Sequence, residues 1–485
     1  MTDSWLQTDT NMIEGDDHVS ETRLERDPLG ELPVPAWALW GIQTERARHN
    51  FPISGLKPLA AFVDAMVWIK RSAALTHRET GRLEPELADA IVAAADEVLA
   101  GQHRDQFVVD PYQAGAGTSH NMNVNEVLAN RANEILGGKR GEYAPVHPND
   151  HVNMAQSTND TIPTAIRLGA LSLLPPLLDA MDRLAQALLE RGRAFDGLVK
   201  VGRTHLQDAT PIRLGQEFTA YGHTVERSRV RVLAAAEPLR ELGIGGSAVG
   251  TGLNVEPEYP ALMVAQLTEL TGIEVREGSD LVQLMQSMGD AAAFSGVLRS
   301  YALDLGKIAN DLRLLSSGPR TGLAEIRLPA VQPGSSIMPG KVNPVIAEMV
   351  NMVCYQVIGN DATVAAASGA GQLELNVMMP VIAHNLFFAM EILTSASRVF
   401  GDRCVAGIEA DEAQLAYWLE RSPAIVTALA PRIGYAEAAK LAKEAVEQNV
   451  TVRELVRAKG ILSAEELASM LDLRAMTDPG VPGER

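Results

Sequence analysis

One stretch of the sequence limits the possible folds more than any other, because it carries a single apolar stripe along one long helix. Apolar residues recur there at alternating spacings of three and four, at Phe294, Val297, Leu298, Tyr301, Leu305, Ile308, Leu312 and Leu315. This is the period of one face of an α-helix, and Gly318-Pro319 closes the pattern. A second segment, which we expect to begin at Pro175-Pro176, repeats the spacing at Leu177, Met181, Leu184 and Leu188.

The segment 345–358, VIAEMVNMVCYQVI, is apolar on almost every face. A helix of this kind is stable in water only when other helices surround it, from the same chain or from further copies. Strand patterns are sparse elsewhere, and an apolar content of 46% can fill a large core. The sequence therefore predicts a mainly α protein with a central bundle of long helices flanked by two smaller helical domains.

Changes in composition predict where these parts begin and end. Residues 1–22 are polar and lack periodicity, so we expect a disordered tail. The Pro- and Gly-punctuated stretch 27–52 predicts irregular chain. Near the C-terminus, where the helical patterns are shorter, Ser463 and Glu466 form a capping-box pattern before a short helix. After the tail we expect an N-terminal helical domain, the bundle and a small C-terminal domain, over 23–155, 156–410 and 411–485.

The formal net charge of −19 disfavours several classes of partner. Nucleic acids and membrane surfaces are negatively charged, so we expect binding to neither. Cys354 and Cys404 form no C-x-x-C pair, and two cysteines in 485 residues indicate a reducing compartment. The N-terminus lacks a signal-peptide pattern, and no run approaches about 18 uninterrupted apolar residues. The sequence therefore predicts a cytoplasmic protein.

Four segments interrupt the helical patterns with clusters of small polar residues. They are GAGTSHNMNVNE at 115–126, HPNDHVNMAQSTND at 147–160, GRTHLQDATP at 202–211 and PGSSIMPGKVNP at 333–344. Helix capping explains any one of them alone, since Asn, Ser and Thr are common N-caps. In the last segment Gly and Pro residues prevent regular structure, while Lys341 offers a positive charge to a carboxylate. Such a loop can become ordered over a ligand.

The loop GSSIMPGKVNP resembles the signature loop of the superfamily that contains fumarases, aspartases, argininosuccinate lyases and adenylosuccinate lyases. The other three segments match the remaining patterns of this superfamily in the same order, and the resemblance runs from about Thr22 to the C-terminus. It implies the three-domain aspartase/fumarase fold and a homotetramer whose central helices form one bundle. Each active site would combine segments of three subunits, which accounts for the apolar segment 345–358.

The resemblance also implies roles for particular residues. Members of the superfamily remove a proton from the carbon beside a carboxylate and expel a leaving group from the next carbon. Ser335 would be the general base, and His205 and Asn159 would lie near the leaving group. Lys341 and Asn343 would hold the carboxylate on the carbon that bears the leaving group. The other carboxylate, which becomes an enediolate, would be surrounded by Thr118, Ser157, Thr158, Thr204 and Ser336.

The histidines and carboxylates show no metal-ligand spacing such as H-x-x-H, so we expect neither a metal nor a cofactor. Oriented hydrogen-bond donors in a dry pocket would then stabilise the enediolate. The expected substrate is a small C4 dicarboxylate.

Two segments favour ammonia elimination from L-aspartate over the other reactions of the superfamily. GAGTS at 115–119 and QSTND at 156–160 resemble aspartases, where fumarases usually have GSGTQ and QSSND. In contrast, HPND at 147–150 and AHN at 383–385 resemble fumarases.

Two single residues fit neither branch. Met379 stands where aspartases usually have Glu and fumarases a basic residue, and His120 is an unusual occupant after Ser119. The alternatives to ammonia elimination from L-aspartate are therefore two, the hydration of fumarate to malate and elimination from a modified aspartate.

Overall fold

The computed structural model of the chain describes residues 21–481. Most of these residues are helical, so the predicted mainly α fold is confirmed. The predicted disordered tail, residues 1–22, lies almost wholly outside the described residues, and Thr22 already begins a strand. The described chain forms two compact units, one from 21–165 with 243–282 and one from 166–242 with 283–481.

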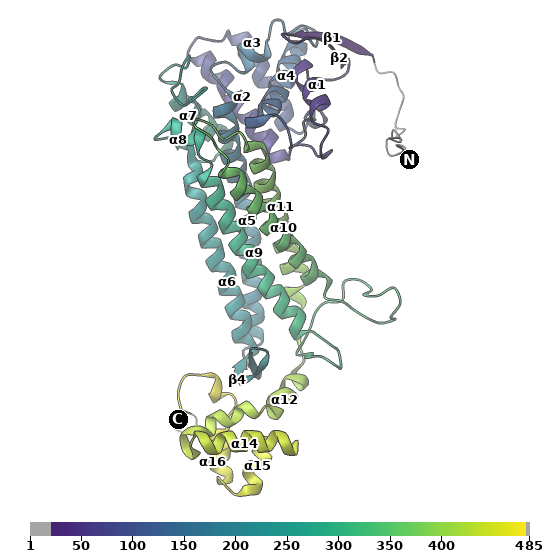
Figure 1. Cartoon of the computed structure of the whole chain (residues 1–485), viewed down its shortest axis with the longest axis vertical. Coiled ribbons are helices and arrows are strands. Elements are labelled where there is room, and N and C mark those ends of the chain that lie inside the picture. Colours follow the sequence, from purple (N-terminus) through teal and green to yellow (C-terminus); the bar gives the residue numbers. More distant parts are fainter. Residues whose placement is uncertain (1–20, 482–485) are drawn as a thin grey trace, which may run out of the picture. The chain divides into compact units, whose positions relative to one another are not determined.

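The first unit is a group of helices that carries a β-hairpin at its N-terminal end (Figure 1). In it α2 packs on α3, α4 and α7, and α1 packs on α4. The prediction of irregular chain over 27–52 is wrong, because a strand and a helix lie within it. The elements are β1 (Thr22–Asp27), β2 (Gly30–Pro35), α1 (Ile42–Asn50), α2 (Ala60–Glu79), α3 (Pro85–Leu99), α4 (Thr118–Ile135), α7 (Tyr259–Thr271) and β6 (Arg276–Glu277).

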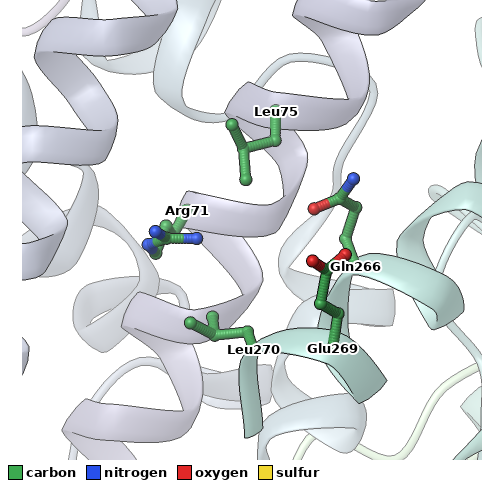
Figure 2. Close-up of a pocket in the computed structure, with 5 residues that line it drawn as sticks. All are labelled: Arg71, Leu75, Gln266, Glu269 and Leu270. Carbon is green, nitrogen blue, oxygen red and sulfur yellow. The ribbon is translucent and has the colours of Figure 1, made fainter.

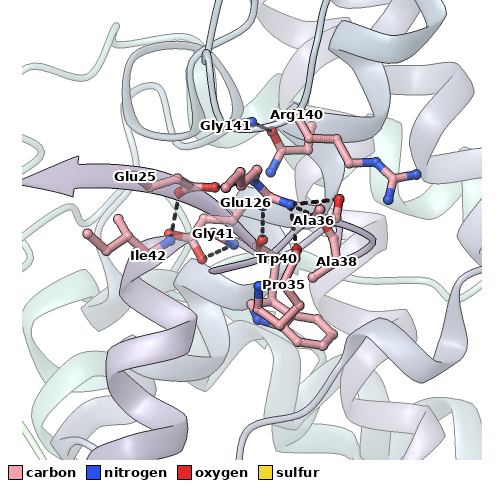
Figure 3. Close-up of polar contacts among 12 residues, drawn as sticks. Glu25, Pro35, Ala36, Ala38, Trp40, Gly41, Ile42, Glu126, Arg140 and Gly141 are labelled. Carbon is pink, nitrogen blue, oxygen red and sulfur yellow. Dashed lines mark hydrogen bonds and ion pairs between the residues drawn. The ribbon is translucent and has the colours of Figure 1, made fainter. Parts of the chain in front are cut away.

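Two buried carboxylates hold the start of α1 (Figure 3). Glu126 of α4 accepts hydrogen bonds of 2.9–3.1 Å from the backbone N–H groups of Gly41, Gln43 and Thr44. Glu25 of β1 accepts from the N–H of Ile42 at 2.8 Å and from the Tyr143 hydroxyl at 2.7 Å. Burial raises the pKa of Glu126 to about 7, and the donors act against this shift. Since α1 has no side-chain cap of its own, these carboxylates satisfy its first N–H groups.

The second unit contains a bundle of long helices (Figure 1). Helix α9 packs on α6, α10 and α11. All residues of the predicted stripe on α9 are buried except Val297, which is half-buried, so this prediction is confirmed. The long helices are α5 (Thr158–Ala194, in this unit from Ile166), α6 (Leu214–Ala236), α9 (Gly289–Leu315), α10 (Val345–Ser368) and α11 (Met379–Arg403), and α8 (Leu281–Gln286) is short.

The predicted helix start at Pro175-Pro176 is wrong, because both prolines lie inside the 37-residue helix α5. Proline removes a backbone donor and usually breaks or kinks a helix. Here the four apolar residues after the pair are completely buried, and this packing outweighs the local cost. They are Leu177, Met181, Leu184 and Leu188.

Helix α10 buries only one face within the chain. Its buried residues include Ala347, Val350, Cys354 and Val357, which follow the helical period. On another face Met352 is 68% exposed and Tyr355 is 63% exposed. The segment that is apolar all round therefore keeps one apolar face uncovered in the single chain.

The second unit also contains short strands and a helical C-terminal part. The strands are β3 (Val199–Thr204), which pairs with β4 (Gln207–Arg213), then β5 (Glu241–Leu242), and β7 (Ile326–Arg327), which pairs with β8 (Glu409–Ala410). The C-terminal helices are α12 (Glu412–Arg421), α13 (Ala430–Ile433), α14 (Tyr435–Gln448), α15 (Val452–Lys459) and α16 (Ala464–Met470).

The C-terminal helices share one apolar cluster, which includes Leu419, Leu441, Val456 and Leu467. The predicted capping box at Ser463 is confirmed. Its hydroxyl accepts from the Glu466 N–H at 3.1 Å, and the Glu466 carboxylate accepts from the Ser463 N–H at 2.9 Å.

Two helices among the described residues are long and apolar enough to cross a membrane by length and composition, Thr158–Ala194 and Met379–Gly407. Of their most apolar windows, 72% and 61% are buried inside the structure. Core helices of a bundle meet the same criterion.

Replacing Gly41 by Ala tests the carboxylate anchor of α1. A Cβ atom there would collide with the Tyr143 hydroxyl and come within 2.9 Å of the carboxylates of Glu126 and Glu25. We expect Gly41→Ala to destabilise the protein by about 1–3 kcal/mol, as overpacking does, measured as a lower thermal midpoint. Gly197→Ala, where a Cβ meets nothing within 4 Å, is the control. Equal midpoints for the two variants would contradict the anchor.

Candidate active site

The start of α5 places three predicted substrate-binding residues in consecutive positions. Ser157 precedes the helix, and Thr158 and Asn159 are its first two residues. The Ser157 hydroxyl accepts from the Asn159 N–H at 3.2 Å, and the Asn159 amide donates to the Ala248 carbonyl at 2.8 Å. All three side chains are half-buried, and the N–H groups of this first turn favour an anion.

A buried aspartate holds this turn in place. Asp160 accepts from the Ser157 N–H at 3.0 Å through one oxygen, and from the N–H groups of Gly245 and Ser247 at 3.1 and 3.0 Å through the other. Burial raises the pKa of Asp160 to about 6, and the three N–H donors act against this shift. The carboxylate therefore ties the start of α5 to the loop at 245–247.

The start of α4 lies against the start of α5. Gly117 has a φ of 92°, and a Cβ at this position would come within 2.9 Å of Ile162 of α5. The next residue, Thr118, begins α4 and is exposed. One turn further on, the Asn121 amide donates to the Thr158 hydroxyl at 3.4 Å. The structure thus brings the start of α4, with Thr118, close to the start of α5.

Lys70 of α2 supports this region, and our sequence analysis did not select it. Its ammonium donates to the Asn153 side-chain oxygen at 2.9 Å and to that of Gln156 at 2.7 Å. Asn153 also accepts from Asn121 and Asn125, at 3.2 Å each. Burial lowers the pKa of Lys70 to about 7. A lysine within the apolar run AAFVDAMVWIK was the available signal, because such a lysine needs polar partners when buried.

His120 is fully buried and stacks on Phe62 of α2, with ring centroids 4.2 Å apart. Burial lowers the pKa of His120 to about 4, and the nearby charge of Lys70 adds to this effect. The histidine is therefore neutral and is part of the packing between α2 and α4.

The hairpin of β3 and β4 presents Thr204 and His205 in the second unit. The two residues of its turn, His205 and Leu206, have φ values of 55° and 58°. Positive φ at both positions is the geometry of a type I′ turn, which suits the twist of paired strands. Thr204 and His205 are exposed at the tip of the hairpin.

The loop 333–344 closes on itself. The Gly334 N–H donates to the Lys341 carbonyl at 2.9 Å, and the Asn343 amide donates to the Gly334 carbonyl at 2.6 Å. A Cβ at Gly334 would lie 2.6 Å from the Asn343 nitrogen and 2.8 Å from Val342, so only glycine fits there. These contacts bring the two ends of the loop together.

Ser335 is half-buried at the start of this loop, whereas Ser336 and Lys341 are exposed. The Ser335 hydroxyl oxygen accepts from the N–H groups of Ile337 and Met338, at 3.2 and 2.8 Å. Two such donors stabilise negative charge on the oxygen.

The ten predicted residues therefore form three groups, the helix starts in the first unit and the hairpin tip and the loop in the second. Within the described part of the second unit, no hydrogen bond joins the hairpin tip to the loop. Among the described residues, no group of three or more His, Cys, Asp and Glu side chains could hold a metal ion.

Comparison with known proteins gives consistent matches. Residues 30–359 match the family described as Lyase, and residues 425–478 match that described as Fumarase C C-terminus. The aspartate ammonia-lyase of Bacillus subtilis is 48% identical over 464 residues, which are 96% of this chain and 98% of that protein. The class II fumarate hydratase of Halobacterium salinarum is 52% identical over 460 residues, which are 95% and 98% of the two chains.

The fold agrees with these matches. A crystal structure of fumarate lyase:delta crystallin from Brucella melitensis, bound to cobalt, has a TM-score of 0.91 and 48% sequence identity. The match covers 95% of this chain and 100% of that one. The family match over residues 30–359 and the relatives that cover nearly the whole chain define a lyase. More specifically, the chain belongs to the aspartase/fumarase superfamily.

The buried His120 predicts a pH dependence of stability. Between its ordinary pKa near 6.5 and its folded value near 4, the unfolded chain binds more protons than the folded one. Stability is therefore lost as the pH falls through this window, by about 2–4 kcal/mol in total. We expect His120→Leu to flatten the fall of the thermal midpoint between pH 6.5 and 4.5.

His49→Leu, at a side chain that is 59% exposed, is the matched control. An unchanged pH profile in His120→Leu would show that other groups cause the dependence.

Proposed function

We propose that this lyase is an aspartate ammonia-lyase, which converts L-aspartate to fumarate and ammonia. The observation that carries the proposal is the pair of segments GAGTS and QSTND, which resemble aspartases and lie together at the starts of α4 and α5. Within QSTND, Thr158 stands where fumarases usually have Ser, and its hydroxyl accepts the bond from Asn121.

In the proposed mechanism Ser335 removes the proton from the carbon beside one carboxylate. The two N–H donors on its oxygen support this role, because a serine base must carry negative charge. That carboxylate becomes an aci-carboxylate, an enediolate dianion. Its charge is stabilised by hydrogen-bond donors at the ends of helices and loops, namely Thr118, Ser157, Thr158, Thr204 and Ser336.

Lys341 and Asn343 bind the second carboxylate, and Asn159 and His205 lie near the departing amino group. An ammonium group leaves as ammonia without a strong acid, whereas hydroxide must be protonated as it leaves. A leaving ammonia therefore makes a smaller demand on His205 than a leaving hydroxide does.

The proposed site requires a homotetramer in which three subunits contribute to each active site. In support, the hairpin tip and the loop of the second unit form two groups that no hydrogen bond joins among the residues that the structure describes. The exposed Met352 and Tyr355 on α10 give an apolar face that further copies would cover. We retain three domains after the tail as part of this proposal, at 23–155, 156–410 and 411–485. We also propose that the enzyme acts in the cytoplasm and binds neither nucleic acid nor membrane.

Class II fumarate hydratase is the second candidate function. The Halobacterium salinarum relative supports it, as do HPND at 147–150 and AHN at 383–385. Met379 favours neither the ammonia-lyases nor the hydratases, because it is fully buried at the first position of α11. Elimination from a modified aspartate is a further form of the first proposal.

The absorbance of fumarate distinguishes the candidates. The purified enzyme is mixed with L-aspartate and, separately, with L-malate, and we expect fumarate to form from aspartate only. Fumarate from malate alone would instead assign the chain to the hydratases. Fumarate from neither substrate would contradict both candidates and leave modified aspartates to be assayed.

Replacing Ser335 tests the general base. We expect Ser335→Ala to lower kcat by about 10²–10⁴-fold, the usual contribution of a general base, with the oligomer intact by size-exclusion chromatography. Ser300→Ala removes a hydroxyl that bonds only within α9, to the Gly296 carbonyl, and serves as the control. A kcat within about twofold of the parent would exclude Ser335 as the base.

A further inference from the structure

A completely buried glutamate, Glu325, lies where several segments of the second unit meet. Its N–H donates to the carbonyl of Leu315, the last residue of α9, at 2.9 Å, and its carbonyl accepts from the Asp411 N–H at 2.9 Å. The next residue, Ile326, begins β7, from which the chain continues into the loop with Ser335. The segment 325–327 is the stem of that loop, and Glu325 is held there by its backbone.

The side chain of Glu325 reaches the hairpin of β3 and β4. One carboxylate oxygen is 2.6 Å from the guanidinium of Arg203, and the other is 3.1 Å from the ammonium of Lys200. Lys200 also pairs with Glu217 of α6 at 2.9 Å. The Glu325 side chain is 0% exposed and that of Arg203 is 14% exposed, so water screens this pair weakly.

The hairpin needs such an anchor because its ladder is irregular next to the tip. The pairing register shifts between Val201 and Arg203, around Gly202. A Cβ at Gly202 would lie 2.6 Å from the Thr210 carbonyl oxygen, so the strands approach closely there. Irregularities of this kind redirect the residues that follow, and the residue after Arg203 is Thr204.

A small cavity lies beside the ion pair. Its volume is about 120 Å³, and its lining includes Lys200, Arg203, Glu217 and Tyr221. Because packing on this side of Arg203 is incomplete, the position of its side chain depends on the charge of Glu325.

We propose that Arg203 and Glu325 are a positioning pair, which fixes the hairpin tip with Thr204 and His205 relative to the stem of the Ser335 loop. This inference rests on the proposed function, because it assumes that both segments act in catalysis. Neither residue touches the substrate in this scheme. Their effect on turnover comes from the orientation of the two segments, and small displacements of reacting groups cost about 10²-fold in rate.

A further pocket lies on the first unit (Figure 2). Its lining combines side chains from α2 and α7, namely Arg71, Leu75, Gln266, Glu269 and Leu270. Arg71 pairs with Asp96 at 2.6 Å, so its charge is already compensated.

The test uses the full-length enzyme and the variants Arg203→Met, Glu325→Gln and their double mutant. We expect each single variant to lower kcat by about 10- to 100-fold while KM changes less than about threefold. The double mutant should be no slower than the slower single variant, since each single variant already removes the Arg203–Glu325 pair. Arg203→Lys keeps the charge and should recover most of the lost rate, which a purely structural role for the guanidinium would not explain.

Arg327→Gln is the matched control, because Arg327 forms its ion pairs with Glu409 and Asp411 at the surface of the same stem. We expect this variant to stay within about twofold of the parent. Losses that add in the double mutant, or an equal loss in Arg327→Gln, would overturn the positioning pair. If Glu325→Gln does not fold, the comparison of Arg203→Met with Arg203→Lys decides the question.

Amide hydrogen exchange separates this inference from the proposed function, because it needs no substrate. Arg203→Met should accelerate exchange in the hairpin 199–213 and leave the helices of the first unit unchanged. Unchanged exchange in the hairpin would overturn the pair even if the enzyme is an ammonia-lyase. Faster exchange in a protein that makes no fumarate would instead count against the proposed function alone.

Discussion

Burial of the apolar stripe on α9 is the interaction on which the second unit depends. The stripe lies on one face of the helix, and α6, α10 and α11 pack against α9. Removing this face from water provides the main driving force for bringing long helices together. Once the helices are packed, their ends lie at fixed places. The hairpin with Thr204 and the loop with Ser335 are connections between these helices, so the bundle limits where the two can lie.

The polar segments are held by a different kind of interaction, namely buried charged groups that accept or donate several hydrogen bonds. Asp160 holds the start of α5, Glu126 holds the start of α1, and Lys70 holds Asn153 and Gln156. Burying a charge costs free energy unless its hydrogen bonds are satisfied. Each of these groups therefore favours one arrangement of the backbone around it. Donors kept in such an arrangement need little reorganisation when charge develops on a substrate.

Much of the fold could be predicted because the pattern of neighbouring residues indicates where helices form. The spacing on α9, the capping box at Ser463 and the mainly α class all follow from neighbouring residues in the sequence. The errors arose where distant residues decide the outcome. Within 27–52 the strand β2 forms because it pairs with β1. The helix α1 begins where Glu126, far along the sequence, binds the N–H groups of Gly41 and Gln43. Helix α5 continues through Pro175-Pro176 because buried leucines on both sides of the proline pair keep it packed.

The predicted site likewise combines features that the local sequence indicates with contacts that exist only in the folded chain. The sequence by itself determined the superfamily, the four polar segments and the residue types available for proton abstraction, since these are properties of consecutive residues. The tertiary structure alone decided that Asn121 reaches Thr158, that His120 stacks on Phe62 inside the unit, and that Glu325 meets Arg203. Each of these contacts joins residues whose separation depends on how whole helices pack. Local sequence patterns carry no information about such distances.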